Sequence, residues 1–252
     1  MWPTWADIIG REFDCFENWG KPSQGNLFIF NSLNECAVKN NINADDTVVV
    51  MWSDIYRNDT YKNNAWEVAP EHGVNRNAMD DRGYLLRDLA YINAAKTMLD
   101  HYGATYYFLS MVPISIMPND TWLNIFSTQF PKSTECDDVA EHYRDAVSLV
   151  RPSVFETVFN YDWFSRPLIP VNCKSIKRPR IDRHPSPLEH LEYLDKILPE
   201  ITINASTRAW VDCADSHVLQ DPMGKDPFQM GSYRPWVQSL NEIWQVSDVN
   251  RL

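Results

Sequence analysis

Asp182 and His184 stand two positions apart in the sequence, just ahead of a segment with helical periodicity. A neutral imidazole takes a proton from a nucleophile when a carboxylate fixes its tautomer, and Asp182 is close enough in sequence to do so. The pair therefore predicts the general base of a hydrolase and its orienting acid. The alternative is a structural turn, in which both side chains bond to backbone amides at the entrance of the helix.

The segment after this pair carries the signals of a helix start. Ser186 is its predicted N-cap, with Glu189 three residues on as the partner of a capping box. An apolar face is formed by Leu188, Leu191 and Leu194. His190 is expected on the solvent-facing surface of this helix. A metal site made of Asp182, His184 and His190 is a further alternative, but no other His or Cys cluster supplies the remaining ligands at a recognisable spacing, so we expect no metal and no cofactor.

Composition restricts the classes of partner. The chain of 252 residues is 44% hydrophobic and has a formal net charge of -11, which argues against nucleic acid and against an anionic membrane surface as partners. Neither an apolar run of about 18 residues nor a signal peptide is visible in the sequence. The five cysteines are scattered without a C-x-x-C spacing, a pattern that suits a reducing compartment. We therefore expect a cytoplasmic protein whose partners include neither nucleic acid nor a membrane.

Alternating helical and apolar stretches predict the framework that positions these residues. We expect helices over 3–12, 26–40 and 84–102, buried strands over 47–52 and 104–112, short strands over 14–18 and 153–159, and mostly helix over 114–150. This alternation predicts an α/β domain over residues 1–200 with a mainly parallel sheet, followed by an aromatic-rich extension, residues 201–252, packed on the same domain. Sites in such sheets form where strands end, so the polar loops after residues 16 and 52 and the loop of Asp182 are expected to be functional.

These three loops, in this order, resemble blocks of the SGNH (GDSL-type) esterase and acyl-hydrolase superfamily, over roughly residues 3–200. In that family a glycine after the second strand supplies an oxyanion donor, and Gly25 matches it, with Gly20 as the alternative. The next block is Gly-x-Asn-Asp; here Ser53 replaces the Asn, with a hydroxyl that can still donate, and Asp54 matches the Asp. The resemblance implies a flavodoxin-like three-layer α/β/α sandwich.

The last block of the family usually spaces its Asp and His by two residues, whereas one residue separates Asp182 from His184. A subset of the superfamily, including alginate acetyltransferase-like members, is similar in this spacing. The nucleophilic serine of the family ends a first strand that precedes a helix like 3–12, and neither that strand nor its block is present here. Since the missing strand would be central in the sheet, we expect the natural reading frame to start roughly 15 to 25 codons earlier. Two internal serines, Ser23 and Ser53, lie in the expected site loops, but neither is predicted on a strand-to-helix elbow.

The resemblance implies a serine esterase or acyl hydrolase for a small or carbohydrate O-acyl ester, with His184 as general base and Asp182 as its orienting carboxylate. Two alternatives stay open, a catalytically inactive binding or structural protein of the same fold and an O-acyltransferase that uses the same residues. Arg57 and Asp59 follow the third block and are expected either to contact the substrate or to form a surface salt bridge.

Overall fold

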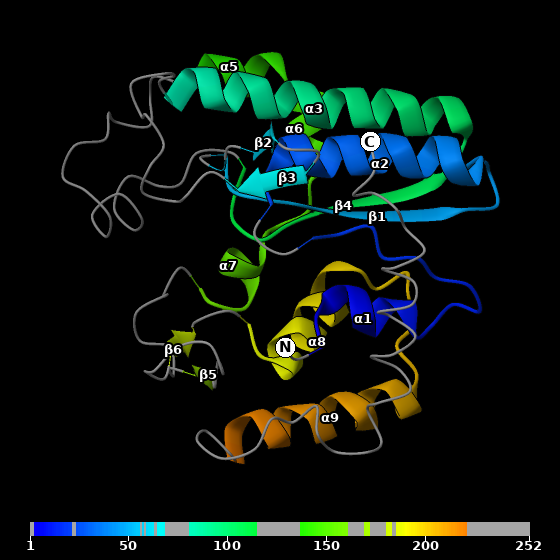
Figure 1. Ribbon diagram of the computed structural model, residues 1–252, viewed down its shortest axis with the longest axis vertical. Helices are drawn as coiled ribbons and strands as arrows, with labels where there is room; N and C mark the ends of the chain where they lie inside the picture. Colours follow the sequence, from blue (N-terminus) through cyan, green and yellow to red (C-terminus); the bar gives the residue numbers. More distant parts are fainter. Residues whose placement is uncertain are drawn as a thin grey trace. The chain divides into compact units, whose positions relative to one another are not determined.

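The computed structural model describes residues 3–21, 24–55, 57, 59–62, 65–68, 81–114, 137–160, 169–171, 180–182 and 185–220 (Figure 1). The chain divides into two compact units, one made of Trp19–Glu156 and the other of Met1–Asn18 with Thr157–Leu252. Both units are described separately below. The described residues combine helices with a small parallel two-stranded sheet, which confirms the predicted α/β class at this coarse level.

A strand–helix–strand unit forms the centre of the first unit. β1 (Thr47–Trp52) and β4 (Thr105–Ser110) pair in parallel, with Thr47 opposite Thr105 and Trp52 opposite Ser110. They are joined through α3 (Asp81–Tyr102), which lies beside α2 (Asn26–Asn40) over one face of the strand pair (Figure 1). The predicted helices at 26–40 and 84–102 and the predicted strands at 47–52 and 104–112 are thus confirmed. Both helices run antiparallel to the two strands (Figure 1).

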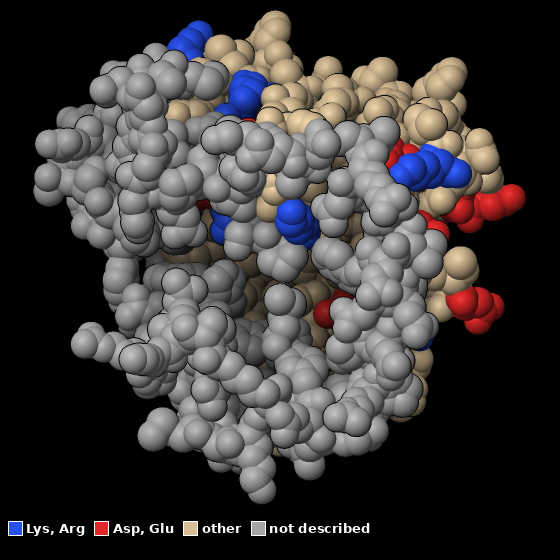
Figure 2. All heavy atoms as spheres, in the orientation of Figure 1, with Lys and Arg blue, Asp and Glu red and all other residues tan. Residues whose placement is uncertain are grey.

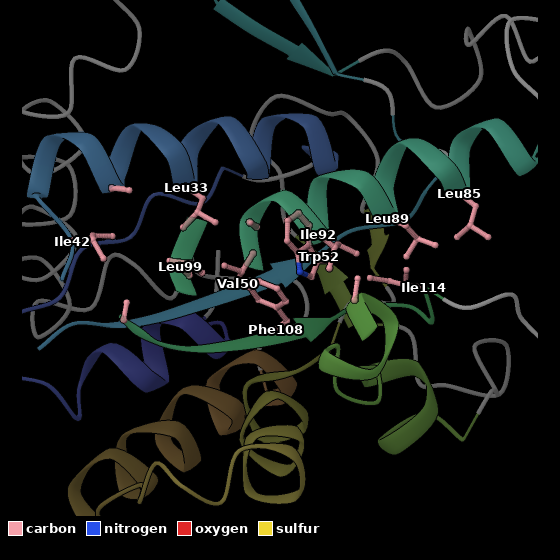
Figure 3. Packing of buried hydrophobic residues seen from close by; sticks show 14 of the residues in the cluster. Leu33, Ile42, Val50, Trp52, Leu85, Leu89, Ile92, Leu99, Phe108 and Ile114 are labelled. Atoms are coloured by element: carbon pink, nitrogen blue, oxygen red, sulfur yellow. The ribbon is translucent and has the colours of Figure 1, made fainter. Parts of the chain in front are cut away.

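Apolar side chains from both helices converge on the strand pair (Figure 3). Trp52 of β1 is fully buried and meets Phe108 of β4 edge to face, with the ring centroids 5.6 Å apart. The α3 side of this core consists of Leu85, Leu89, Ile92, Ala95 and Leu99, all fully buried. Their spacing of three and four residues is that of one helix face. Burial of this face holds α3 on the sheet and fixes which α3 side chains reach the end of β1.

The segment after β4 forms short helices where it is described and contacts β4 again. It contains α5 (Asp137–His142), α6 (Arg144–Leu149) and α7 (Val154–Thr157). Val150 forms a parallel bridge with Phe108, and the Arg151 amide donates to the Phe108 carbonyl at 2.9 Å. The predicted strand over 153–159 is wrong because Ser153 starts a helix. Its hydroxyl accepts from the Glu156 amide at 3.2 Å while the Glu156 carboxylate accepts from the Ser153 amide at 2.7 Å, which together form a capping box.

A hairpin lies within the long loop that the sequence predicts after β1. Its strands, β2 (Asp59–Lys62) and β3 (Ala65–Val68), pair antiparallel. Trp66 meets Phe28, in the first turn of α2, edge to face with the ring centroids 5.8 Å apart. The Lys21 ammonium also donates to the Trp66 carbonyl at 3.1 Å. The hairpin therefore contacts the start of α2 through Phe28 and the segment that precedes α2 through Lys21.

The second unit is mainly helical where it is described. It contains α1 (Trp5–Gly10), α8 (Pro187–Ile197), α9 (Ala205–Gln220) and the antiparallel hairpin of β5 (Ile169–Val171) and β6 (Arg180–Asp182). The predicted strand over 14–18 is wrong: residues 11–15 turn and bend, and residues 16–18 have no regular structure. Asp and Asn, which disfavour strands, stand at both ends of that segment.

The capping box predicted for α8 is confirmed. The Ser186 hydroxyl accepts from the Glu189 amide at 3.3 Å, and the Glu189 carboxylate accepts from the Ser186 amide at 2.7 Å. Asp215 of α9 is buried and accepts from the Leu188 amide in the same first turn. The prediction that His190 is solvent-facing is wrong, since only 6% of it is exposed. It lies one turn from Leu194, which is also buried.

Charged side chains of both signs are interspersed on the face shown in Figure 2, as far as the described residues go. Ion pairs one helical turn apart join Lys39 to Glu35 on α2 and Lys96 to Asp100 on α3. In the described part of the chain, no helix combines the length and the apolar character that a membrane span requires.

Candidate functional site

The predicted blocks around Gly25 and Ser53 meet where β1 ends. Asn26 is the first residue of α2, and its side chain is fully buried. Its Oδ1 accepts from the Ser53 amide at 2.7 Å, and its Nδ2 donates to the Ser53 carbonyl at 3.1 Å. One side chain thus satisfies both backbone groups of the residue that follows β1. This pairing joins the start of α2 to the end of the strand.

A buried carboxylate on α3 completes this arrangement. Asp88 is fully buried; its Oδ2 accepts from Asn26 Nδ2 at 2.6 Å and its Oδ1 from Arg87 Nε at 2.6 Å. Burial raises the pKa of Asp88 to about 6, although the hydrogen bonds from Arg87 and Asn26 and the charge of Arg87 act to lower it. The negative charge of Asp54 adds to the increase in pKa. Burial therefore disfavours the ionised form of Asp88, whereas two hydrogen-bond donors, from Arg87 and Asn26, favour it.

Arg87 holds the chain segment that leaves β1. Its Nη2 donates to the Ile55 carbonyl at 2.8 Å and to the Arg57 carbonyl at 3.2 Å. The guanidinium carbon also lies 5.2 Å from the centroid of the Tyr84 ring. Arg87 thereby positions the carbonyl groups of Ile55 and Arg57 against α3. We use the name β1-end cluster for the set of residues that meet here: Gly25, Asn26, Ser53, Asp54, Arg57, Asp59, Arg87 and Asp88.

Asp59 caps α2 from a distant position in the chain. Its Oδ1 accepts from the Gly25 amide at 2.6 Å and its Oδ2 from the Phe28 amide at 2.8 Å. These amides belong to the first turn of a helix, where backbone donors lack intrahelical partners and negative charge is favoured. Asp59 is only 8% exposed. It is a buried helix cap and not the surface ion-pair partner that was one of its two predicted roles.

Gly25 is required here by a close approach of backbone. A Cβ at this position would lie 2.8 Å from the Arg57 carbonyl oxygen, 2.9 Å from the Arg57 Cβ and 3.0 Å from Asp59 Oδ2. Its amide, predicted to face an oxyanion, donates to Asp59 in this structure. Gly20, the predicted alternative donor, is exposed in the irregular segment before α2.

Three predicted site residues of the β1-end cluster are partly exposed: Ser53, Asp54 and Arg57. The Arg57 guanidinium makes a long contact of 3.4 Å from Nη1 to the Gln24 carbonyl. For the Ser53 hydroxyl, the described residues offer no hydrogen-bond partner. The β1-end cluster therefore includes a partly exposed serine, arginine and aspartate. Such a set suits a polar ligand with both donors and acceptors.

The predicted acid–base pair is only partly within the described residues. Asp182 is the last residue of β6, opposite Ile169 in the hairpin, whereas His184 and Ser23 lie outside the described residues. The roles of Asp182 and His184 stay predictions. Among the residues that the structure describes, no group of three or more His, Cys, Asp or Glu side chains gathers in a way that would hold a metal ion.

Sequence reasoning missed Asn26, Arg87 and Asp88. A signal for Asp88 existed in the helical spacing. It lies three residues after Leu85, next to Leu89 and four residues before Ile92, on the buried face of the helix. A charged residue on a buried face needs a partner. Its partner Asn26 is 62 residues away, so no local pattern could have identified it.

Comparison of the chain with models of protein families, with curated proteins and with solved structures finds no match.

Proposed function

We propose that the chain is an SGNH-like serine esterase or acyl hydrolase that acts on a small or carbohydrate O-acyl ester, within a flavodoxin-like three-layer sandwich. The observation that carries the proposal is the double hydrogen bond of Asn26 to the Ser53 backbone. It brings the Gly25 block and the Ser53–Asp54 block together at the carboxyl end of a parallel strand. That is the end of the strands at which sites form in open α/β sheets.

In this proposal His184 takes the proton of the nucleophilic serine, and Asp182 holds the imidazole in the tautomer that can accept it. The carbonyl oxygen of the ester becomes negatively charged as the nucleophile attacks. A donor fixed in place beforehand stabilises that charge. The Ser53 hydroxyl is suited to this role because the backbone on both sides of its Cα is held by Asn26. Transfer of the acyl group to a sugar instead of water would use the same residues.

A specific observation favours the second candidate, a catalytically inactive binding or structural protein. The Gly25 amide donates to a carboxylate of its own chain at 2.6 Å. An amide held in this way is not available to an oxyanion while Asp59 stays in place. A binding protein has no need of that donor, whereas a hydrolase that relies on the Gly25 amide would have to move Asp59.

The test is hydrolysis of p-nitrophenyl acetate by the protein expressed from its natural gene, together with labelling by a fluorophosphonate. We expect H184A to lower kcat/KM by roughly 10²- to 10⁴-fold, the usual range for loss of a general base. The matched control is H101A, since His101 is exposed in the last turn of α3; it is expected to leave kcat/KM unchanged. A folded protein that neither turns over the ester nor takes the label, or an H184A variant as active as the control, would contradict the proposal.

A further inference from the structure

Both carboxylate oxygens of Asp88 are acceptors for groups that can only donate. Arg87 Nε–H bonds to Oδ1 and the Asn26 amide nitrogen bonds to Oδ2, each at 2.6 Å. A guanidinium has no acceptor atom, and the amide nitrogen of Asn has none either. A proton on Asp88 therefore has no acceptor at either of these two contacts. The ionised carboxylate fits both contacts, whereas the neutral acid fits them poorly.

Asn26 cannot adapt by rotating its amide. If the amide turned over, its oxygen would face Asp88, but its nitrogen would then face the Ser53 amide, which is also a donor. The present orientation is the one in which Oδ1 accepts from Ser53 at 2.7 Å and Nδ2 donates to both the Ser53 carbonyl and Asp88. The state of Asp88 is therefore linked to Ser53 through a single side chain with one usable orientation.

We propose that Asp88 is a positioning residue which, in its ionised form, holds Asn26 and through it the Ser53 peptide at the end of β1. The role of this peptide in catalysis rests on the proposed function, but the coupling itself does not. Loss of the negative charge on Asp88 loosens the contact with Asn26. The Ser53 peptide then loses the fixed partner for its amide and carbonyl.

The charged and titratable groups that face Asp88 come from two parts of the fold. Arg87 and Tyr91 lie on its own helix, and Asp54 follows β1; the α2 residue that contacts it, Asn26, is uncharged. Burial raises the Asp88 pKa to about 6, so the coupling is expected to act between pH 5 and 7. Because histidine side chains in general titrate in the same pH range, a pH profile of activity would not separate Asp88 from a histidine general base.

The experiment is therefore a spectroscopic titration that needs no substrate. In the ¹⁵N-labelled full chain, the Ser53 backbone amide and the Asn26 side-chain amide are followed by NMR from pH 4.5 to 8. We expect both signals to shift together with a midpoint about pH 6, and D88N to abolish the shift. The control is D54N, which removes the carboxylate next to Ser53 in the sequence. It is expected to retain the shift with a lower midpoint, because the charge of Asp54 raises the pKa of Asp88.

The coupling is refuted if the wild-type Ser53 amide does not titrate in this range, if the titration persists in D88N, or if D54N abolishes it. If D88N does not fold, the wild-type and D54N titrations decide between these outcomes. Failure of the proposed function is seen separately, as an H184A variant that matches its control in ester hydrolysis. If the Ser53 amide titrates as expected but the protein has no esterase activity, the coupling between Asp88 and Ser53 stands and the proposed esterase function is wrong.

Discussion

Replacing Asp59 with Ala removes the cap of α2, and the structure gives the expected size of the effect. Two backbone amides lose a charged acceptor, at 2.6 Å for Gly25 and 2.8 Å for Phe28. A hydrogen bond to a charged group contributes about 1.5–3 kcal/mol, whereas substitution of an ordinary side-chain cap costs about 0.5–2 kcal/mol. Because Asp59 makes two such bonds and is 8% exposed, we expect D59A to lower the free energy of unfolding by about 3 kcal/mol.

The variant D59N, which keeps the volume of the side chain, shows how much of the loss in D59A comes from the hydrogen bonds. D59N keeps one acceptor oxygen but places an amide nitrogen against the second backbone donor, so we expect a loss of about 2 kcal/mol. The assay is urea unfolding followed by tryptophan fluorescence. The control is D45A, in the exposed turn before β1, with an expected change within about 0.5 kcal/mol. A loss below about 1 kcal/mol for D59A, or a D59N variant as stable as the wild type, would show that the cap is replaced by water and refute this reasoning.

Two further predictions concern the same cluster. Since the folded-state pKa of Asp88 is raised from 3.8 to about 6, the folded protein binds its proton more tightly; this stabilisation is present below pH 4 and lost as the pH rises through 6. The whole shift corresponds to about 3 kcal/mol, most of which is lost between pH 4 and 7, so the unfolding free energy of wild type minus that of D88N should fall by about 2 kcal/mol over this range. Urea titrations with a flat difference would disprove it. G25A, whose Cβ would meet the Arg57 carbonyl oxygen at 2.8 Å, is expected to lose about 2–3 kcal/mol in thermal or urea unfolding. G103A is the control, with a positive φ but no contact closer than 3.6 Å and an expected loss of about 1 kcal/mol; equal losses in both variants would contradict the overlap argument.

Local signals in the sequence were sufficient for the main elements of the Trp19–Glu156 unit. The helix at 26–40 is bounded by Gly25 at its start and by Asn41 in the left-handed conformation at its end, and both bounds agree with the prediction. The strand predicted over 153–159 is wrong, and its apolar residues stand in two pairs four positions apart, Val154 with Phe155 and Val158 with Phe159, which is a helical spacing. Ser153 and Glu156, at the spacing of a capping box, were the stronger signal.

The candidate site could be predicted only in part, for a physical reason. Gly25 and Ser53 were named as candidates through the family resemblance of the loops in which they lie, and their roles stay predictions. Asn26, Asp59 and Asp88 act through contacts that join residues 27, 31 to 34 and 62 positions apart. Such contacts exist only once α2, β1 and α3 are packed together, and neither periodicity nor local spacing encodes them.

The distance along the chain between α2 and its cap also bears on the order in which the protein folds. Asp59 is 34 residues after Gly25, so the first turn of α2 obtains its cap only after the hairpin of β2 and β3 has docked. A contact that closes so large a loop forms late unless it belongs to the folding nucleus. We therefore expect the loss of the Asp59 cap to appear mainly as faster unfolding, with the folding rate little changed. The start of α2 would then be the part of this helix that opens first in the native state, and its amides would exchange with solvent sooner than those near Ala37.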